Sequence, residues 1–286
     1  MKLLALVQEA AAQLQEAGVA FGHGTTNALD EAAWLVLWRL GLPLDSLDDE
    51  AGREVPGEAQ QQVRALVRER IARRQPAAYL TREAWLQGVP FYVDERAIVP
   101  RSFIAELLAE GSIDPWLDAS TRQVLDLCTG NGSLAVLAAL AWPDVRVDAA
   151  DLSADALAVA RINVDRHGLA DRIRLVQSDG LAALPGPYDL ILCNPPYVNA
   201  QAMAQLPPEY RAEPALALAG GADGMDFIRT LLRDAAARMR EAAVLVLEIG
   251  HERENFERAF PRLEAVWLET SAGADQVLLL TREALM

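Results

Sequence analysis

The chain has 286 residues, of which 52% are hydrophobic and 23% charged. This composition excludes a disordered chain and allows a large buried core. The 26 Lys and Arg residues against 41 Asp and Glu residues give a formal charge of −15. That balance argues against a protein that grips nucleic acid over its whole surface.

The cysteines and the apolar stretches set further limits. Cys128 and Cys193 are far apart and the histidines are scattered, so we expect neither a disulfide framework nor a metal site. Gln8, Glu9 and Glu16 interrupt the opening apolar stretch, which argues against a signal peptide. No window reaches the ~20 apolar residues that cross a bilayer, so we expect a cytoplasmic protein with no membrane partner.

The first 75 residues are predicted to be helical. Apolar residues recur at helix spacing over 3–14, and Asn27 precedes a second helix that Gly41 can end. A third helix is expected over 58–74. No β–α–β alternation occurs here, so we predict a separate helical domain over 1–75, with a role in substrate recognition.

The third predicted helix carries a run of arginines. A solvated helix face is one interpretation, and contact with an acidic partner such as RNA is the other. The run consists of Arg64, Arg68, Arg70, Arg73 and Arg74.

The remaining chain changes character twice. Aromatic and β-branched residues around Gly88 and Pro90 predict a β-hairpin linker over 76–100. Over 101–286, short apolar strands alternate with amphipathic helices, which indicates an α/β domain whose mostly parallel sheet is covered on both faces. Two strands close together at the C-terminus predict an antiparallel edge.

The first chemical motif, Asp126-Leu-Cys-Thr-Gly130-Asn-Gly132, lies where the first strand of the α/β domain passes into its helix. Glycines there let the backbone approach a ligand, and the helix start offers free N–H groups. Asp151, 21 residues after Gly130, ends the next strand and can accept both hydroxyls of a ribose. The third glycine of a dinucleotide fingerprint is missing, so the motif fits a nucleoside without pyrophosphate, namely S-adenosylmethionine.

The end of the third strand adds a further candidate position. Asp179 would meet the adenine, with Gly180 leaving room beside it. Each of these residues also has a structural interpretation. The glycines could serve packing alone, Asp151 could cap a helix, and Asp179 could be a solvated acid in a loop. The predicted cofactor-binding residues are Asp126, Cys128, Thr129, Gly130, Asn131, Gly132, Asp151, Asp179, Gly180 and Asn194.

The second motif, Asn194-Pro195-Pro196-Tyr197, follows the apolar strand DLILC. The prolines lock an extended turn and have no N–H groups, so the Pro195 carbonyl and the Asn194 side-chain oxygen are free acceptors. Together they can hold both hydrogens of a planar –NH2 group and aim its developing lone pair at a sulfonium methyl. Tyr197 can pack on that group. We predict that these four residues are catalytic; a rigid strand-end turn is the alternative.

Three weaker signals remain. The glycine-rich stretch over 213–224 could cover the substrate or form a surface loop. Glu248 and His251 could act as acid and base, although a strand end followed by a helix start is favoured. The two cysteines, at strand ends, are expected to be reduced packing residues.

Together with these two motifs, the chain resembles the N5-glutamine methyltransferases over nearly its whole length. That family has a helical N-terminal domain, a hairpin and a Rossmann-like class I S-adenosylmethionine-dependent methyltransferase domain with N-P-P-Y. One branch modifies peptide release factors, and the other modifies a glutamine of the third large-subunit ribosomal protein. The stretches PAAYLTREAWLQGVPFYVDERAIVPRS, LPPEYRAEPALALAGGADGMD and LLLTREAL resemble the second branch, as does Cys128, where release-factor enzymes usually have glycine.

The resemblance implies roles for both motifs. The stretch 128–132, Asp151 and 179–180 would bind S-adenosylmethionine, and 194–197 would bind the glutamine amide. Asn131 departs from the family's commoner serine or threonine, and Gly180 from a larger residue that is frequent in the release-factor branch. Stacking of a side chain at position 180 on adenine is therefore not implied.

We accordingly expect N5-methylation of a glutamine side-chain amide in a large-subunit ribosomal protein, free or in an assembling subunit. Ribosomal proteins are strongly basic, so the acidic chain would attract them. The alternatives are a release-factor methyltransferase, a nucleic-acid amine methyltransferase of the adenine N6 type, and a scaffold protein that retains the cofactor. The acidity and the lack of a basic target-reading domain disfavour the nucleic-acid enzyme, and the intact N-P-P-Y disfavours the scaffold.

Overall fold

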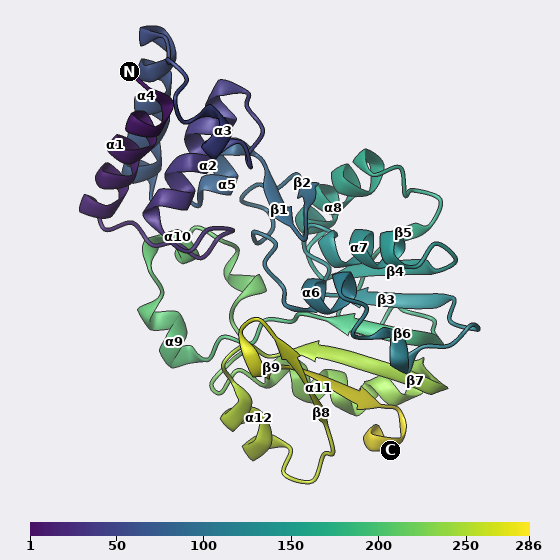
Figure 1. The fold of residues 1–286 in the computed structure, drawn as a ribbon. Helices are drawn as coiled ribbons and strands as arrows, with labels where there is room; N and C mark the ends of the chain where they lie inside the picture. Colours follow the sequence, from purple (N-terminus) through teal and green to yellow (C-terminus); the bar gives the residue numbers. More distant parts are fainter.

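Buried apolar side chains gather in three large clusters in the computed structural model, which describes residues 1–286 (Figure 1). One cluster fills a helical unit and draws on residues from Leu3 to Val99. The other two lie on opposite faces of a seven-stranded sheet, because successive residues of a strand point to opposite faces. Val124 thus joins one cluster and Leu125 the other.

The helical unit is built from local signals that the sequence carries. The Asn27 side chain caps its second helix by accepting a hydrogen bond from the Asp30 N–H at 3.0 Å. Gly41 ends that helix in the left-handed conformation, so both predicted ends are confirmed. The helices of this unit are α1 (Leu3–Glu16), α2 (Ala28–Leu40), α3 (Leu47–Glu50), α4 (Gly57–Arg73) and α5 (Ala77–Thr81).

A hairpin connects the helical unit to the sheet. Its strands, β1 (Ala84–Leu86) and β2 (Val89–Phe91), pair antiparallel. Just after β2, the Asn163 side chain accepts a hydrogen bond from the Tyr92 N–H at 2.7 Å and donates one to the Tyr92 carbonyl at 2.9 Å. The hairpin is thereby attached to the α/β unit.

The sheet has the strand order β5-β4-β3-β6-β7-β9-β8. Only β9 runs opposite to its neighbours, and it pairs with β7 on one side and with the edge strand β8 on the other, so the predicted antiparallel edge is confirmed. The four consecutive residues from Val277 to Leu280 are buried because both faces of the sheet are covered there, whereas β8 exposes Val266. The strands are β3 (Gln123–Leu127), β4 (Arg146–Asp151), β5 (Ile173–Gln177), β6 (Tyr188–Cys193), β7 (Met239–Glu248), β8 (Val266–Thr270) and β9 (Gly273–Thr281).

Helices cover both faces of the sheet, which confirms the predicted Rossmann-like α/β class. One face is covered by α6 (Ile104–Ala109), α7 (Ser133–Ala141) and α8 (Ala154–Arg166), and the other by α11 (Asp226–Ala235) and α12 (Arg253–Ala259). Two short helices, α9 (Ala200–Gln205) and α10 (Pro208–Arg211), follow β6. None of the helices is both long and apolar enough to cross a membrane.

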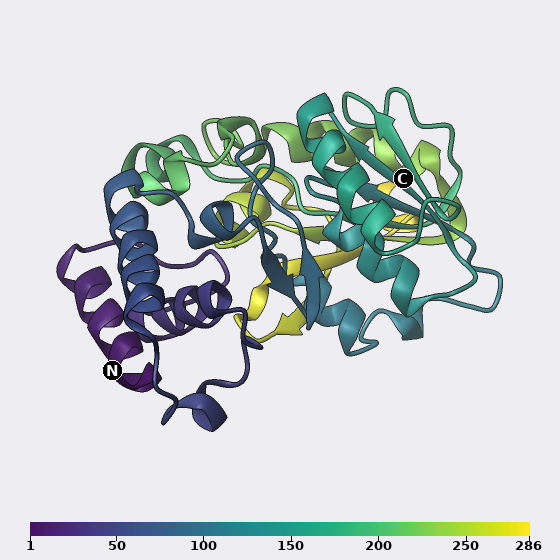
Figure 2. The same cartoon turned by 90° about the horizontal axis from the view of Figure 1, so that it is seen from above.

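A buried ion cluster joins α10 to the helical unit. Arg70 of α4 and Glu209 of α10 are fully buried and form an ion pair at 3.2 Å. Arg70 also pairs with Glu31 of α2 at 2.9 Å, and Arg74 contacts Glu209. Figures 1 and 2 show α10 against the helices of this unit. The segment after β6 is therefore attached to the first 75 residues.

Most arginines of the run in and just after α4 form ion pairs with carboxylates of the same chain. Arg68 is exposed and has no ion pair, whereas its neighbours have carboxylate partners. An RNA contact by this run stays a prediction, for which the exposed Arg68 is the uncommitted side chain. The pairs are Arg64–Glu9, Arg70–Glu209, Arg73–Glu69 and Arg74–Glu209.

Replacing Arg70 by Met should destabilise the protein by about 3 kcal/mol, because Glu31 and Glu209 would keep buried charges without this partner. The exposed Arg73→Met should change stability little, since its pair with Glu69 lies in water. Urea unfolding of both variants measures the difference. Equal stabilities would show that the buried cluster contributes no more than a surface pair.

Candidate active site

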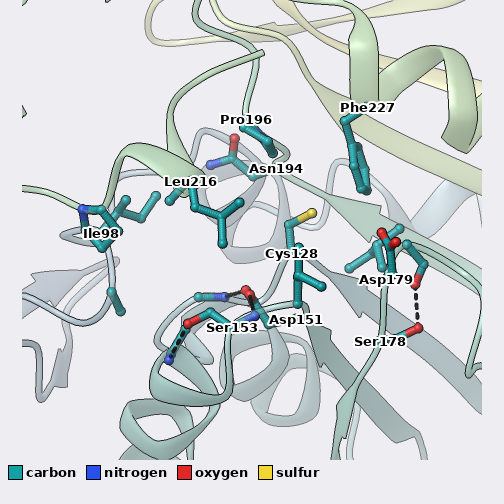
Figure 3. A pocket seen from close by; sticks show the side chains of 18 of the residues that line it. Ile98, Cys128, Asp151, Ser153, Ser178, Asp179, Asn194, Pro196, Leu216 and Phe227 are labelled. Carbon is teal, nitrogen blue, oxygen red and sulfur yellow. Dashed lines mark hydrogen bonds between the residues drawn. The ribbon is translucent and has the colours of Figure 1, made fainter. Parts of the chain in front are cut away.

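Two cavities lie at the carboxyl ends of the parallel strands, where ligands of such sheets bind. They share a wall that consists of Ile98, Asn194 and Ala217. The first cavity, called the cofactor cavity below, contains residues of the glycine motif and the ends of β4 and β5 (Figure 3). The second, called the amide cavity, contains Pro195 and Tyr197.

The glycine motif bends from β3 into α7 through three residues with positive φ: Cys128, Gly130 and Gly132. A Cβ at Gly130 would have no atom within 4 Å, so the backbone there is open to a ligand. A Cβ at Gly132 would lie 3.1 Å from that of Ala160, so this glycine lets the loop pack on α8. Cys128 adopts the left-handed conformation although it is not glycine, and it lines the cofactor cavity.

Asp126 lies behind this loop rather than in the cavity. Its buried carboxylate accepts hydrogen bonds from the Thr129 hydroxyl and from the Ala135 N–H, and burial raises the pKa of Asp126 to about 7. Thr129, Asn131 and Gly132 are likewise outside the lining. The structure therefore divides the motif: Cys128 and Gly130 face the cavity, and the other predicted residues hold the loop in shape.

Asp151 faces the cavity from the end of β4. Its carboxylate accepts hydrogen bonds from the Gly130 N–H at 2.9 Å and the Ser153 N–H at 2.8 Å. Burial raises the pKa of Asp151 above its usual value. These two amides fix the carboxylate beside the open backbone of the glycine loop.

The side walls of the cofactor cavity are partly apolar. Asp179 and Gly180 line it as predicted, and a Cβ at Gly180 would lie 4.0 Å from the Phe227 ring. Figure 3 shows Phe227 on the same side as Asp179, with Leu216 and Ile98 opposite. Phe227 lies outside the motifs of the sequence. Ile98 lies in one of the stretches that carry the family resemblance, and Leu216 lies in the stretch 213–224, for which covering the substrate is one interpretation.

Asn194 lies half-buried between the two cavities, directly after β6. Its side-chain amide forms no hydrogen bond within the chain. By contrast, Asn199 caps α9 by accepting from the Ala202 N–H at 2.9 Å and donates to Glu252 at 2.6 Å. The side-chain amide of Asn199 is thus used by the fold, whereas that of Asn194 is available to a ligand.

Tyr197 is surrounded by glycines. A Cβ at Gly250 would come within 2.5 Å of the Tyr197 ring, and one at Gly220 within 2.7 Å of the Tyr197 backbone. Gly224 approaches the Tyr197 carbonyl still more closely. The stretch 213–224 is therefore no free surface loop, because it packs against the N-P-P-Y turn.

One buried carboxyl group, Glu248, lines the amide cavity, and a second, Glu213, is paired with Arg101, which also lines it. Glu248, at the end of β7, accepts hydrogen bonds from the Ser102 hydroxyl and the Phe103 N–H, and burial raises the pKa of Glu248 to about 7. Burial alone would also raise the pKa of Glu213, but the ion pair with Arg101 at 2.7 Å and the His23 ring nitrogen 3.3 Å away hold it at about 2. The cavity wall thus contains an easily protonated acid, Glu248, and an arginine whose charge is paired with a buried carboxylate.

Glu248→Gln should alter the dependence of stability on pH. Its folded pKa of about 7 lies above the usual 4.5, so its contribution is fully present below about pH 4.5 and is lost as pH rises through 7. At pH 8 the variant should be about 1–3 kcal/mol more stable than the wild type, and at pH 5 nearly equal to it.

Urea unfolding between pH 5 and pH 8 measures this effect. The exposed Glu264→Gln is the matched control and should follow the wild-type curve. Parallel curves for Glu248→Gln and the wild type would contradict the assignment.

Similarity to known proteins agrees with this architecture. The family model "Methyltransferase small domain" matches residues 107–207, which include both motifs. The hMettl16 catalytic domain in complex with MAT2A 3′UTR hairpin 1 matches with a TM-score of 0.55 and 14% identity, over 82% of this chain and 84% of that chain. This likeness concerns the fold alone.

Relatives of higher identity extend over the full chain. The ribosomal protein uL3 glutamine methyltransferase of Bordetella pertussis is 54% identical, over 98% of this chain and 95% of that protein. The protein of the same name from Burkholderia pseudomallei is 53% identical, over 96% and 92%. That of Bradyrhizobium diazoefficiens is 45% identical, over 96% and 89%. The chain therefore belongs to the family of the ribosomal protein uL3 glutamine methyltransferases, and it is a methyltransferase.

Proposed function

We propose that the protein transfers a methyl group from S-adenosylmethionine to the side-chain amide nitrogen of a glutamine in ribosomal protein uL3. The observation that carries this proposal is the position of Asn194, whose uncommitted amide separates the cofactor cavity from the amide cavity. A donor in the first cavity and an acceptor in the second would meet there. The names of the full-length relatives supply the substrate.

The lining of the cofactor cavity fits S-adenosylmethionine. The fixed carboxylate of Asp151 suits a ribose, whose hydroxyls are donors. Phe227 and the bare backbone at Gly180 leave a flat apolar space suited to a base. Leu216 lines the cavity with 56% of its surface exposed, and a bound nucleoside would cover it. When bound, the cofactor supplies an electrophilic methyl group on a sulfonium centre.

The substrate nitrogen is a poor nucleophile because its lone pair is delocalised into the amide. We propose that the Asn194 side-chain oxygen and the Pro195 carbonyl accept hydrogen bonds from its two hydrogens and hold the nitrogen in position. Tyr197 would pack on the amide plane. Methyl transfer would then be a direct displacement, in which the N–C bond forms as the C–S bond breaks. The nitrogen becomes acidic as it gains the methyl, so no strong base is required.

We further propose a division of labour among residues 1–75, 76–100 and 101–286. The first segment would recognise the protein substrate, since its Gly22 contributes to the amide cavity that 101–286 otherwise forms. The strongly acidic chain would attract a basic ribosomal protein. Ribosomal proteins are made in the cytoplasm, where we place the reaction. A nucleic-acid substrate is disfavoured, because most of the arginine run is already paired within the chain.

Incubation with S-adenosylmethionine and free uL3 should add the mass of one methyl group to uL3, and fragmentation should locate it on a glutamine. A release factor offered under the same conditions should gain none. Mass spectrometry of ribosomal proteins from cells with and without the gene gives the matching test in vivo. Methylation of the release factor but not of uL3 would overturn the substrate assignment.

Two substitutions should separate the roles of the cavities. Asn194→Ala should lower kcat by about 100-fold or more and change the cofactor Kd by less than about threefold, because its amide positions the substrate. Asp151→Asn should weaken cofactor binding by about tenfold, with the exposed Asp155→Asn as its matched control. Calorimetric titration and initial rates measure both. Equal losses of kcat and cofactor affinity in Asn194→Ala would refute the substrate role.

A further inference from the structure

A groove outside the two cavities lies between α2, the loop that follows it, and the hairpin. Three of the chain's six tryptophans line it: Trp34, Trp38 and Trp85. Trp85, on β1, is 45% exposed, although a chain of this size has room to bury so large an apolar ring. We call this site the tryptophan groove.

The charges in the tryptophan groove have one sign. Its lining includes the carboxylates of Asp45 and Glu83 and contains no Lys, Arg or His. Glu83 accepts a hydrogen bond from the Trp85 indole N–H at 2.8 Å, which fixes one aromatic face beside a negative charge. Guanidinium and ammonium groups bind where an aromatic face lies next to a carboxylate, because both attract a positive charge.

Trp34 lines the groove as an apolar surface. The residue is only 8% exposed, and its indole nitrogen is fully buried and has no hydrogen-bond partner. Because an atom of a ligand cannot reach that nitrogen, the Trp34 ring offers packing surface rather than a hydrogen bond.

The groove and the amide cavity lie along one short stretch of chain. Gly22 lines the amide cavity, and Gly24 and Thr25 line the tryptophan groove. A Cβ at Gly24 would lie 3.8 Å from the Trp34 ring. Consecutive residues of an extended chain span about 3.3–3.6 Å each, so a substrate segment of several residues reaches from one site to the other.

We propose that the tryptophan groove binds an Arg- or Lys-rich segment of the same protein substrate that presents its glutamine to the amide cavity. This inference rests on the proposed function and deepens it by naming the chemistry of a second contact. Cationic side chains would lie on Trp38 and Trp85 within the field of Asp45 and Glu83. An RNA segment is disfavoured, because these carboxylates repel phosphates.

The test compares steady-state methylation of free uL3 by three variants. Trp85→Ala removes an aromatic face, and the double variant Glu83→Gln with Asp45→Asn removes both charges at nearly constant shape. Each should raise the KM for uL3 by about five- to tenfold and leave kcat within about twofold. The control Trp116→Ala removes another exposed tryptophan, which lies between α6 and β3 and does not line the groove, and should change neither constant.

The dependence of KM on ionic strength and a further variant, Trp85→Lys, test whether the contact is electrostatic. Raising ionic strength should increase KM for the wild type and have a smaller effect on the charge-neutral variant. Trp85→Lys repels a basic segment at an exposed position and should raise KM at least as much as Trp85→Ala. An unchanged KM in all groove variants would overturn the proposal. So would a rise confined to the tryptophan variants, because it would leave the carboxylates without a role.

A binding measurement separates this proposal from the proposed function. A glutamine-free peptide of alternating arginine and glycine should quench tryptophan fluorescence in the wild type and bind at least about fivefold more weakly to the charge-neutral variant. If the wild type failed to methylate uL3, the substrate assignment would fall while this titration still reported on the groove. Equal binding of the peptide to both proteins would overturn the groove assignment whatever the activity.

Discussion

The turn at Tyr197 depends on the absence of side chains around it. Gly220, Gly224 and Gly250 come from two separate segments, and each approaches Tyr197 more closely than a Cβ would allow. Their contacts fix the N-P-P-Y turn from behind, so its front faces both cavities. Prolines restrict the backbone within the turn, and the glycines restrict its position in the molecule. The role proposed for the free amide of Asn194 depends on a turn that is held in place in this way.

The helical unit takes part in the site through carboxylates that follow this turn. Glu209 is bound by Arg70 and Arg74, and Glu213 by Arg101 with His23 close by. Arg101 precedes α6, so the second pair also draws the end of the linker toward the cavity. Both carboxylates are fully buried, and a buried charge that lost its partners would cost several kcal/mol. The wall of the amide cavity is consequently shared by segments from all three parts of the chain.

Local patterns predicted the elements well, because apolar runs and caps act within a few residues. The ends of α2 follow from Asn27 and Gly41, and both motifs lie at strand ends as expected. The features that the sequence did not predict depend on contacts with residues that are distant along the chain. The inner place of β9 depends on its pairing with both β7 and β8, which no local pattern specifies. Asp126 looked like a ligand contact, yet its neighbours in space make it a support for the loop.

The arginine run illustrates the same limit. Arg70 and Arg73 look alike in a helical pattern, but one is fully buried between two carboxylates and the other is exposed. The partners of Arg70 lie 39 and 139 residues away, beyond any periodicity. No sequence pattern predicted that Phe227 lines the cofactor cavity. Its helix, α11, is brought to that cavity by the order of the strands in the sheet, which is set by distant contacts.

The separation of Arg70 and Glu209 also has a consequence for synthesis. The two residues are 139 positions apart, which corresponds to about 7–30 s of translation at about 5–20 residues per second. Until α10 has been made, Glu209 cannot pair with Arg70 or Arg74, and Glu31 is the carboxylate of the cluster that the chain already contains. The same short helix carries Tyr210, which lines the amide cavity. The complete ion cluster and this part of the cavity wall can therefore form only after the second half of the chain has been made.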